Sequence, residues 1–192
     1  MYFRSVIRGL FIAFAIMALV TGPKILSAQS PTKAPRLGVT TINAIRTMAV
    51  INGRTLPAVQ GRGLVVAFFA SWCPPCRPEF GELNKLRRMF SPDDVNIVAI
   101  NLFEDYFADK SGVRMKRFLG ETRPEFTVLQ AKDDTAIRQA FGRVDRIPTV
   151  FVYDRIGNPV YTFIHKEGAS KMHVTATEIE PRLREALASP TQ

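Results

Sequence analysis

Apolar residues form two dense runs with a helical pattern between them. Residues 64–70 are apolar without alternation, which is typical of a strand buried on both faces of a parallel or mixed sheet. Residues 95–101 form a second predominantly apolar segment and predict a second buried strand. Between them, Phe80, Leu83 and Leu86 recur at helical spacing. The pattern therefore predicts a strand, a sharp turn, a helix and a neighbouring strand.

The second half of the chain continues the alternation of helices and strands. Asp133 and Asp134 suit the start of a helix, because acidic residues favour the positive end of the helix dipole. We expect a helical segment at 107–119, a short strand at 126–129, a helix at 135–141, a hairpin of 150–153 with 160–164, and an amphipathic helix at 175–187. This order predicts an α/β fold in which helices flank a central mixed β-sheet.

A separate hairpin is predicted before the first core strand. Residues 48–51 and 54–56 flank Asn52-Gly53, the dipeptide that suits the positive φ angles of a type I′ turn. We expect this N-terminal β-hairpin to lead into the strand at 64–70.

The first residues have the pattern of an export segment. Arg4 and Arg8 precede an apolar run over 10–20, which is shorter than the roughly 20 residues that span a bilayer. We expect 1–28 to be a signal peptide cut after Ala28, or else an N-terminal membrane anchor, since Leu26 is large for the small-residue cleavage pattern. Either alternative places the protein outside the cytoplasm. The expected divisions are a linker at 29–36, a domain at 37–188 and a tail at 189–192.

The charge changes this picture little. The chain of 192 residues has a formal charge of +9, which falls to +6 without Arg4, Arg8 and Lys24 of the leader. No nucleic-acid-binding module is recognisable, so we expect no nucleic-acid partner. Basic clusters on the expected helices fit a solvated surface, or docking to an acidic protein or an anionic membrane.

Cys73 and Cys76 are the only cysteines, and they stand where the first core strand turns into a helix. A helix N-terminus favours a thiolate, so we expect Cys73 to lie exposed there and to act as the nucleophile. Cys76, three residues later, is then the resolving thiol that attacks the mixed disulfide.

The sequence disfavours three other roles for the cysteine pair. A structural disulfide closing so short a loop constrains the unfolded chain little. Zinc needs two further ligands, and no spacing recruits His165 or His173. Covalent haem attachment needs histidine where Arg77 stands. We therefore expect a redox-active pair, with no cofactor and no metal.

The segment Ala70-Ser-Trp-Cys-Pro-Pro-Cys-Arg77, together with Ile147-Pro148-Thr149, resembles the thioredoxin fold. The export leader, the early hairpin and the long insertion between Asn101 and Phe126 resemble the TlpA/ResA-type (AhpC/TSA-Redoxin-like) exported thiol-disulfide oxidoreductases. The resemblance covers about 37–187. It implies a redox-active disulfide between Cys73 and Cys76. It also implies a substrate-binding surface of Trp72, the backbone of Ile147, and a cis Pro148 packed beside the cysteines.

The resemblance further implies a periplasmic reductase of protein disulfides, which serves cytochrome c maturation or copper-site assembly. A membrane electron donor of the CcdA/DsbD type would keep it reduced. A DsbA-like oxidase that donates its disulfide is one alternative, and a non-catalytic copper-binding or adaptor module is another. A peroxiredoxin is a third, but the Thr-x-x-Cys pattern of that class is absent around both cysteines.

The chain departs from thioredoxins at one position. Thioredoxins carry a buried Asp six residues before the first cysteine, where this sequence has Ala67. Glu104 or Glu79 is a candidate to take over its proton transfer through water.

Overall fold

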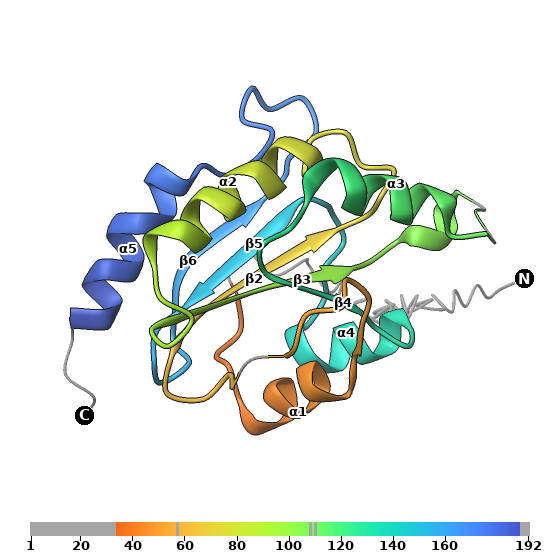
Figure 1. Ribbon diagram of the computed structural model, residues 1–192. Helices are drawn as coiled ribbons and strands as arrows, with labels where there is room; N and C mark the ends of the chain where they lie inside the picture. Colours follow the sequence, from red (N-terminus) through yellow and green to blue (C-terminus); the bar gives the residue numbers. More distant parts are fainter. Residues whose placement is uncertain (1–33, 57, 108, 110, 189–192) are drawn as a thin grey trace, which may run out of the picture.

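A computed structural model describes residues 34–188 except 57, 108 and 110 (Figure 1). Its centre is a mixed sheet of six strands in the order β1-β4-β3-β2-β5-β6. The strands are β1 (Ala49–Val50), β2 (Gly63–Phe69), β3 (Val95–Asn101), β4 (Thr127–Gln130), β5 (Thr149–Tyr153) and β6 (Pro159–Ile164). The three central strands β4, β3 and β2 run parallel, whereas β1, β5 and β6 join antiparallel.

Helices cover both faces of this sheet (Figure 1). One hydrophobic cluster joins it to α2 (Cys76–Met89), α3 (Val113–Thr122) and α5 (Ala176–Ala188). A second cluster joins the opposite face to α1 (Val39–Thr47) and α4 (Asp134–Phe141). Every residue of β2 and β3 is buried, which accounts for their non-alternating apolar sequences. The predicted α/β architecture with a mixed sheet and flanking helices is thus confirmed.

The predicted N-terminal hairpin is wrong. Only Ala49 and Val50 form a strand, and they pair antiparallel with β4 rather than with 54–56. The side chain of Asn52 donates to the carbonyl of Phe126 (2.7 Å) and accepts from the N–H of Val128 (3.1 Å). Asn52 therefore ties the turn to β4, and the chain beyond it does not fold back on β1. The helix α1, which precedes β1, was not predicted.

The insertion between β3 and β4 contains a short 3-10 helix, η1 (Glu104–Tyr106), followed by α3. The helix α3 begins at Val113, later than the predicted 107, because Gly112 has a left-handed backbone (φ +67°) and ends the preceding turn. The helix α4 begins as predicted, with Asp133 accepting a 2.9 Å hydrogen bond from the N–H of Ala136.

The expected leader at 1–28, most of the expected linker and the tail at 189–192 lie outside the described residues. Within the described part of the chain, no helix has the length and hydropathy that crossing a membrane requires. At its N-terminal end, Ala34 is buried and its N–H donates to Thr162 Oγ1 (3.1 Å) on β6.

Candidate active site

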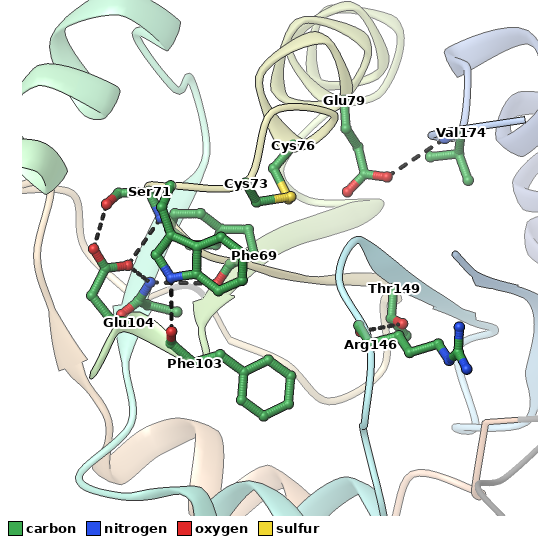
Figure 2. The surroundings of a disulfide bond; sticks show 12 residues. Phe69, Ser71, Cys73, Cys76, Glu79, Phe103, Glu104, Arg146, Thr149 and Val174 are labelled. Atoms are coloured by element: carbon green, nitrogen blue, oxygen red, sulfur yellow. Dashed lines mark hydrogen bonds between the residues drawn. A yellow bond between two sulfur atoms is a disulfide. The ribbon is translucent and has the colours of Figure 1, made fainter. Parts of the chain in front are cut away.

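A disulfide joins Cys73 and Cys76 in the turn between β2 and α2, with the two Cα atoms 5.4 Å apart (Figure 2). The N–H of Cys76 donates to the carbonyl of Cys73 (3.3 Å), so a tight turn brings the two residues together. The helix begins at Cys76. Cys73 therefore lies just before the helix N-terminus rather than in its first turn. Contrary to the expectation of an exposed thiol, Cys73 is only 2% exposed, and Cys76 is fully buried.

The peptide bond between Ile147 and Pro148 is cis, as the resemblance implies. Pro148 immediately precedes β5, and Thr149 is paired with Phe68 near the end of β2, from which the cysteine turn departs. The sheet thus brings Pro148 to the same end as the disulfide, although the two lie far apart in sequence. Figure 2 shows Arg146 and Thr149, which flank Ile147 and Pro148, among the surroundings of the disulfide.

Trp72 belongs to an aromatic cluster beside the disulfide. Its indole N–H donates to the carbonyl of Phe103 (2.8 Å), and its ring lies 5.0 Å from that of Phe107 and 6.2 Å from that of Tyr106. Tyr106 and Phe107 are 69% and 52% exposed. The cluster extends the surface expected of Trp72 alone, because the insertion after β3 supplies the rings of Tyr106 and Phe107, with the ring of Phe103 stacked on Tyr106 (5.1 Å).

Glu104 holds the residues that precede the cysteines. Its carboxylate accepts hydrogen bonds from the N–H of Ser71 (2.9 Å), from the Ser71 hydroxyl and from the side-chain amide of Asn101 (2.8 Å) (Figure 2). These contacts link the end of β3 to the turn that leads to Cys73. Glu104 is therefore placed to position the turn, and its oxygens are already occupied by these donors.

Glu79 is the acid that the fold buries next to the cysteines. It lies on α2 three residues after Cys76, so the two side chains share one side of the helix. The side chain is fully buried, and burial raises the pKa of its carboxyl to about 8. One carboxylate oxygen has no hydrogen-bond partner among the described residues. Figure 2 shows the carboxylate between the disulfide and Val174, on the other side of the disulfide from Glu104.

Neither histidine joins this group into a metal site. No cluster of three or more His, Cys, Asp or Glu residues able to hold a metal ion occurs in the described part of the chain. Ala67 is buried in the same hydrophobic cluster as both cysteines, so an apolar residue occupies the place of the thioredoxin Asp. Of the two acids proposed from the sequence, Glu79 is thus the one whose burial and raised pKa suit proton exchange.

The chain matches a known protein family and known relatives in sequence. The Redoxin family model matches residues 45–179. The thiol-disulfide oxidoreductases ResA of Bacillus thuringiensis (strain Al Hakam) and Bacillus subtilis (strain 168) are each 26% identical over 126 residues. This alignment spans 66% of the present chain and 68% and 66% of the two relatives, respectively.

Solved structures share the fold at lower identity. StoA from Bacillus subtilis superposes with a TM-score of 0.54 at 21% identity, covering 70% of this chain and 92% of StoA. A thiol-disulfide isomerase from Corynebacterium glutamicum gives a TM-score of 0.59 at 17% identity, covering 74% and 92% of the two chains. These likenesses establish a thioredoxin-like fold.

A thioredoxin-like fold with a cysteine pair at its first strand-to-helix turn defines a thiol-disulfide oxidoreductase. The chain belongs to the Redoxin family, and within it to the TlpA/ResA type.

Proposed function

We propose that this protein is an exported reductase of protein disulfides that works through the dithiol of Cys73 and Cys76. The observation that carries the proposal is the burial of Glu79 beside the Cys73–Cys76 pair, at the end of the sheet where the cis Pro148 also lies. A structural disulfide would need none of this surrounding chemistry.

The reaction begins with the reduced protein. The thiolate of Cys73 attacks one sulfur of a substrate disulfide, which forms a mixed disulfide and releases the other substrate sulfur as a thiolate. Cys76 then attacks the Cys73 sulfur, which releases the second substrate thiolate and leaves the Cys73–Cys76 disulfide. Two electrons pass to the substrate, and the disulfide observed here is the oxidised product.

Glu79 is the proton acceptor that we assign to Cys76. Cys76 attacks only as a thiolate, and its burial opposes loss of the proton to bulk water. The pKa of the Glu79 carboxyl, about 8, is close to that of an ordinary thiol. A proton therefore exchanges between the two groups with little free-energy difference. Glu79 thereby takes the role that a buried Asp holds in thioredoxins, from a different element of the fold.

The substrate surface in this proposal comprises Trp72, Ile147 and Pro148. The aromatic cluster with Tyr106 and Phe107 offers exposed apolar area next to the disulfide. The backbone of Ile147 would pair with an extended substrate segment across Pro148. These groups flank the cysteines, as a platform that presents a disulfide to Cys73 must.

The N-terminal sequence supports a periplasmic location for the domain, either soluble after cleavage or tethered to the inner membrane. Such a reductase needs electrons from across the membrane, so we propose a donor of the CcdA/DsbD type. Apocytochrome c thiols or copper-site assembly proteins are the substrate classes that the family resemblance supports.

The reduction potential of the Cys73–Cys76 couple, measured against glutathione, tests the direction of the reaction. We expect a value nearer to that of thioredoxin, about −270 mV, than to that of DsbA, about −120 mV. A value at the DsbA end would assign the protein to the disulfide-donating oxidases. Catalysed reduction of insulin disulfides by the wild type should accompany the reducing value, with no activity in Cys73→Ser.

A further inference from the structure

The strand β6 forms one edge of the sheet, with β5 as its only strand neighbour in the described structure. Phe163 pairs with Val150, Tyr161 with Val152, and the N–H of His165 donates to the carbonyl of Pro148 (3.0 Å). Backbone groups of successive residues in an antiparallel strand point alternately toward and away from the partner. The N–H and C=O groups of Thr162 and Ile164 therefore point away from β5, toward the open edge.

A groove of about 770 Å³ follows this edge. Its walls are β6 residues 161–164, part of the segment 165–171 that follows, and Arg146. Among the described residues, no hydrogen bond uses the outward backbone groups of Thr162 or Ile164, and the N–H of Ala34 donates to the side chain of Thr162 (3.1 Å), not to its backbone. The groove thus combines an unpaired strand edge with room for an extended chain, which is the arrangement used in β-strand addition.

The charges at the groove favour an acidic occupant. Arg146 and Lys166 are exposed, and no described carboxylate forms an ion pair with either. Lys171 also lines the groove, where it is paired with Glu178, and Glu167 is the one acid in the lining. The excess of basic side chains is complementary to a segment that carries glutamates or aspartates.

The groove also reaches the redox site. Arg146 immediately precedes the cis Ile147–Pro148 bond, and His165 hydrogen-bonds directly to Pro148. A chain lying on β6 therefore ends next to the residues that we assign to substrate binding. The imidazole Nδ1 of His165, a residue of the groove lining, is buried without a hydrogen-bond partner among the described residues.

We propose that the open edge of β6 binds an extended acidic segment of the substrate protein as an added strand, and so holds the substrate while its disulfide lies at Cys73. This docking site rests on the proposed function in one respect, namely that the bound protein is a disulfide substrate. It adds to that function a class of partner: proteins with an acidic, extended segment near the disulfide.

Fluorescence anisotropy of a labelled ten-residue peptide, alternating glutamate and threonine without cysteine, tests the site on the full-length oxidised protein. A peptide with lysine in place of glutamate is the comparison, and we expect the acidic peptide to bind at least about tenfold more tightly.

Two pairs of protein variants test the strand edge and the charge. Ile164→Pro removes an outward N–H, and Ile164→Ala removes the same side chain but keeps that N–H. Lys166→Glu reverses a charge in the groove. Its control is Arg46→Glu, which reverses the charge of an exposed residue on α1, a helix that covers one face of the sheet away from the groove.

We expect Ile164→Pro and Lys166→Glu to weaken binding at least about fivefold, and Ile164→Ala and Arg46→Glu to change it less than twofold. All four variants should reduce a small aromatic disulfide at the wild-type rate, which shows that they fold and keep the redox site intact.

Three results would overturn the docking site: equal binding of the two peptides, equal binding by Ile164→Pro and Ile164→Ala, or sedimentation of the wild type as a dimer that Ile164→Pro dissociates, without peptide binding. The last would assign the edge to a second copy of the chain. A protein that binds the acidic peptide at β6 but reduces no disulfide would lose the proposed function and keep the docking site.

Discussion

The backbone N–H of Val174 donates a 3.5 Å hydrogen bond to Glu79, and no other hydrogen bond to this carboxylate occurs in the described residues. Val174 lies just before α5, so the contact joins α2 to the segment that leads into α5 beside the disulfide. One long hydrogen bond compensates little for the burial of a charge, and burial accordingly dominates the raised pKa of Glu79.

The first prediction concerns stability as a function of pH. Glu79 holds its proton up to about pH 8 in the folded protein, whereas the unfolded chain releases it near 4.5. The folded state therefore binds more protons between these values, and the free energy of unfolding falls as pH rises from about 5 to 9. Because one pKa unit corresponds to about 1.4 kcal/mol, we expect the free energy of unfolding to fall by about 4 kcal/mol between pH 5 and 9. Urea denaturation of the oxidised protein across this range measures it.

Glu79→Gln is the control for this pH dependence, because glutamine fills the same space and does not titrate. We expect the variant to lack most of the decline and to be more stable than the wild type at pH 9. An unchanged slope in Glu79→Gln would show that other groups cause the pH dependence.

The second prediction concerns the resolving step. Glu79→Gln removes the proton acceptor assigned to Cys76 but leaves the first attack by Cys73 unaltered. We expect the mixed disulfide to persist about a hundredfold longer, with the rate of its formation within about threefold of wild type. Rapid acid quenching followed by mass spectrometry measures both rates. If both rates fell equally, Glu79 would have a general structural role instead.

The third prediction concerns Glu104. Glu104→Ala leaves the N–H of Ser71 and the amide of Asn101 without their acceptor, so we expect a loss of about 1–3 kcal/mol in the free energy of unfolding. Glu125→Ala is a suitable control, since it removes a carboxylate that pairs only at the surface with Arg88 and should cost less than about 1 kcal/mol. Equal losses would contradict a positioning role for Glu104.

The fourth prediction concerns Gly157, which lies in the turn between β5 and β6. Its backbone is left-handed (φ +84°), and a Cβ placed there would lie 2.7 Å from the carbonyl oxygen of Leu37. Gly168 has a similar φ of +74° but open space around it. Both alanine variants incur the backbone strain, of about 1 kcal/mol, and only Gly157→Ala adds a steric clash. We expect Gly157→Ala to lower the melting temperature by clearly more than Gly168→Ala in calorimetry.

The fold was predictable where burial alone decides the structure. The strands β2 and β3 are buried on both faces, so their sequences lack polar alternation and can be recognised without knowledge of the partners. The two-residue strand β1 was mispredicted because its partner is β4, about 80 residues away, and local turn chemistry at Asn52-Gly53 contains no information about that pairing. Tertiary hydrogen bonds from Asn52 override the hairpin signal.

The site was predictable in part for a similar reason. Cys73 and Cys76 lie three residues apart in sequence, and resemblance supplied Pro148, but the aromatic cluster at Trp72 depends on how the insertion folds back over the turn. Glu79 carried a local signal: it shares the helical spacing of Leu83 and Leu86, so a carboxylate stands on the apolar face of its helix. An acid at a core position of an amphipathic helix is the pattern that identifies such a residue.

Cys73 is the attacking sulfur and Cys76 the resolving one in the proposed reaction, and a trapping experiment tests this division of roles most directly. Reduced Cys76→Ser, incubated with insulin and analysed by mass spectrometry without reductant, should accumulate a mixed disulfide located at Cys73. Reduced Cys73→Ser should form none under the same conditions. Absence of the adduct in Cys76→Ser, or disulfide exchange at the wild-type rate in Cys73→Ser, would contradict these roles of the two cysteines.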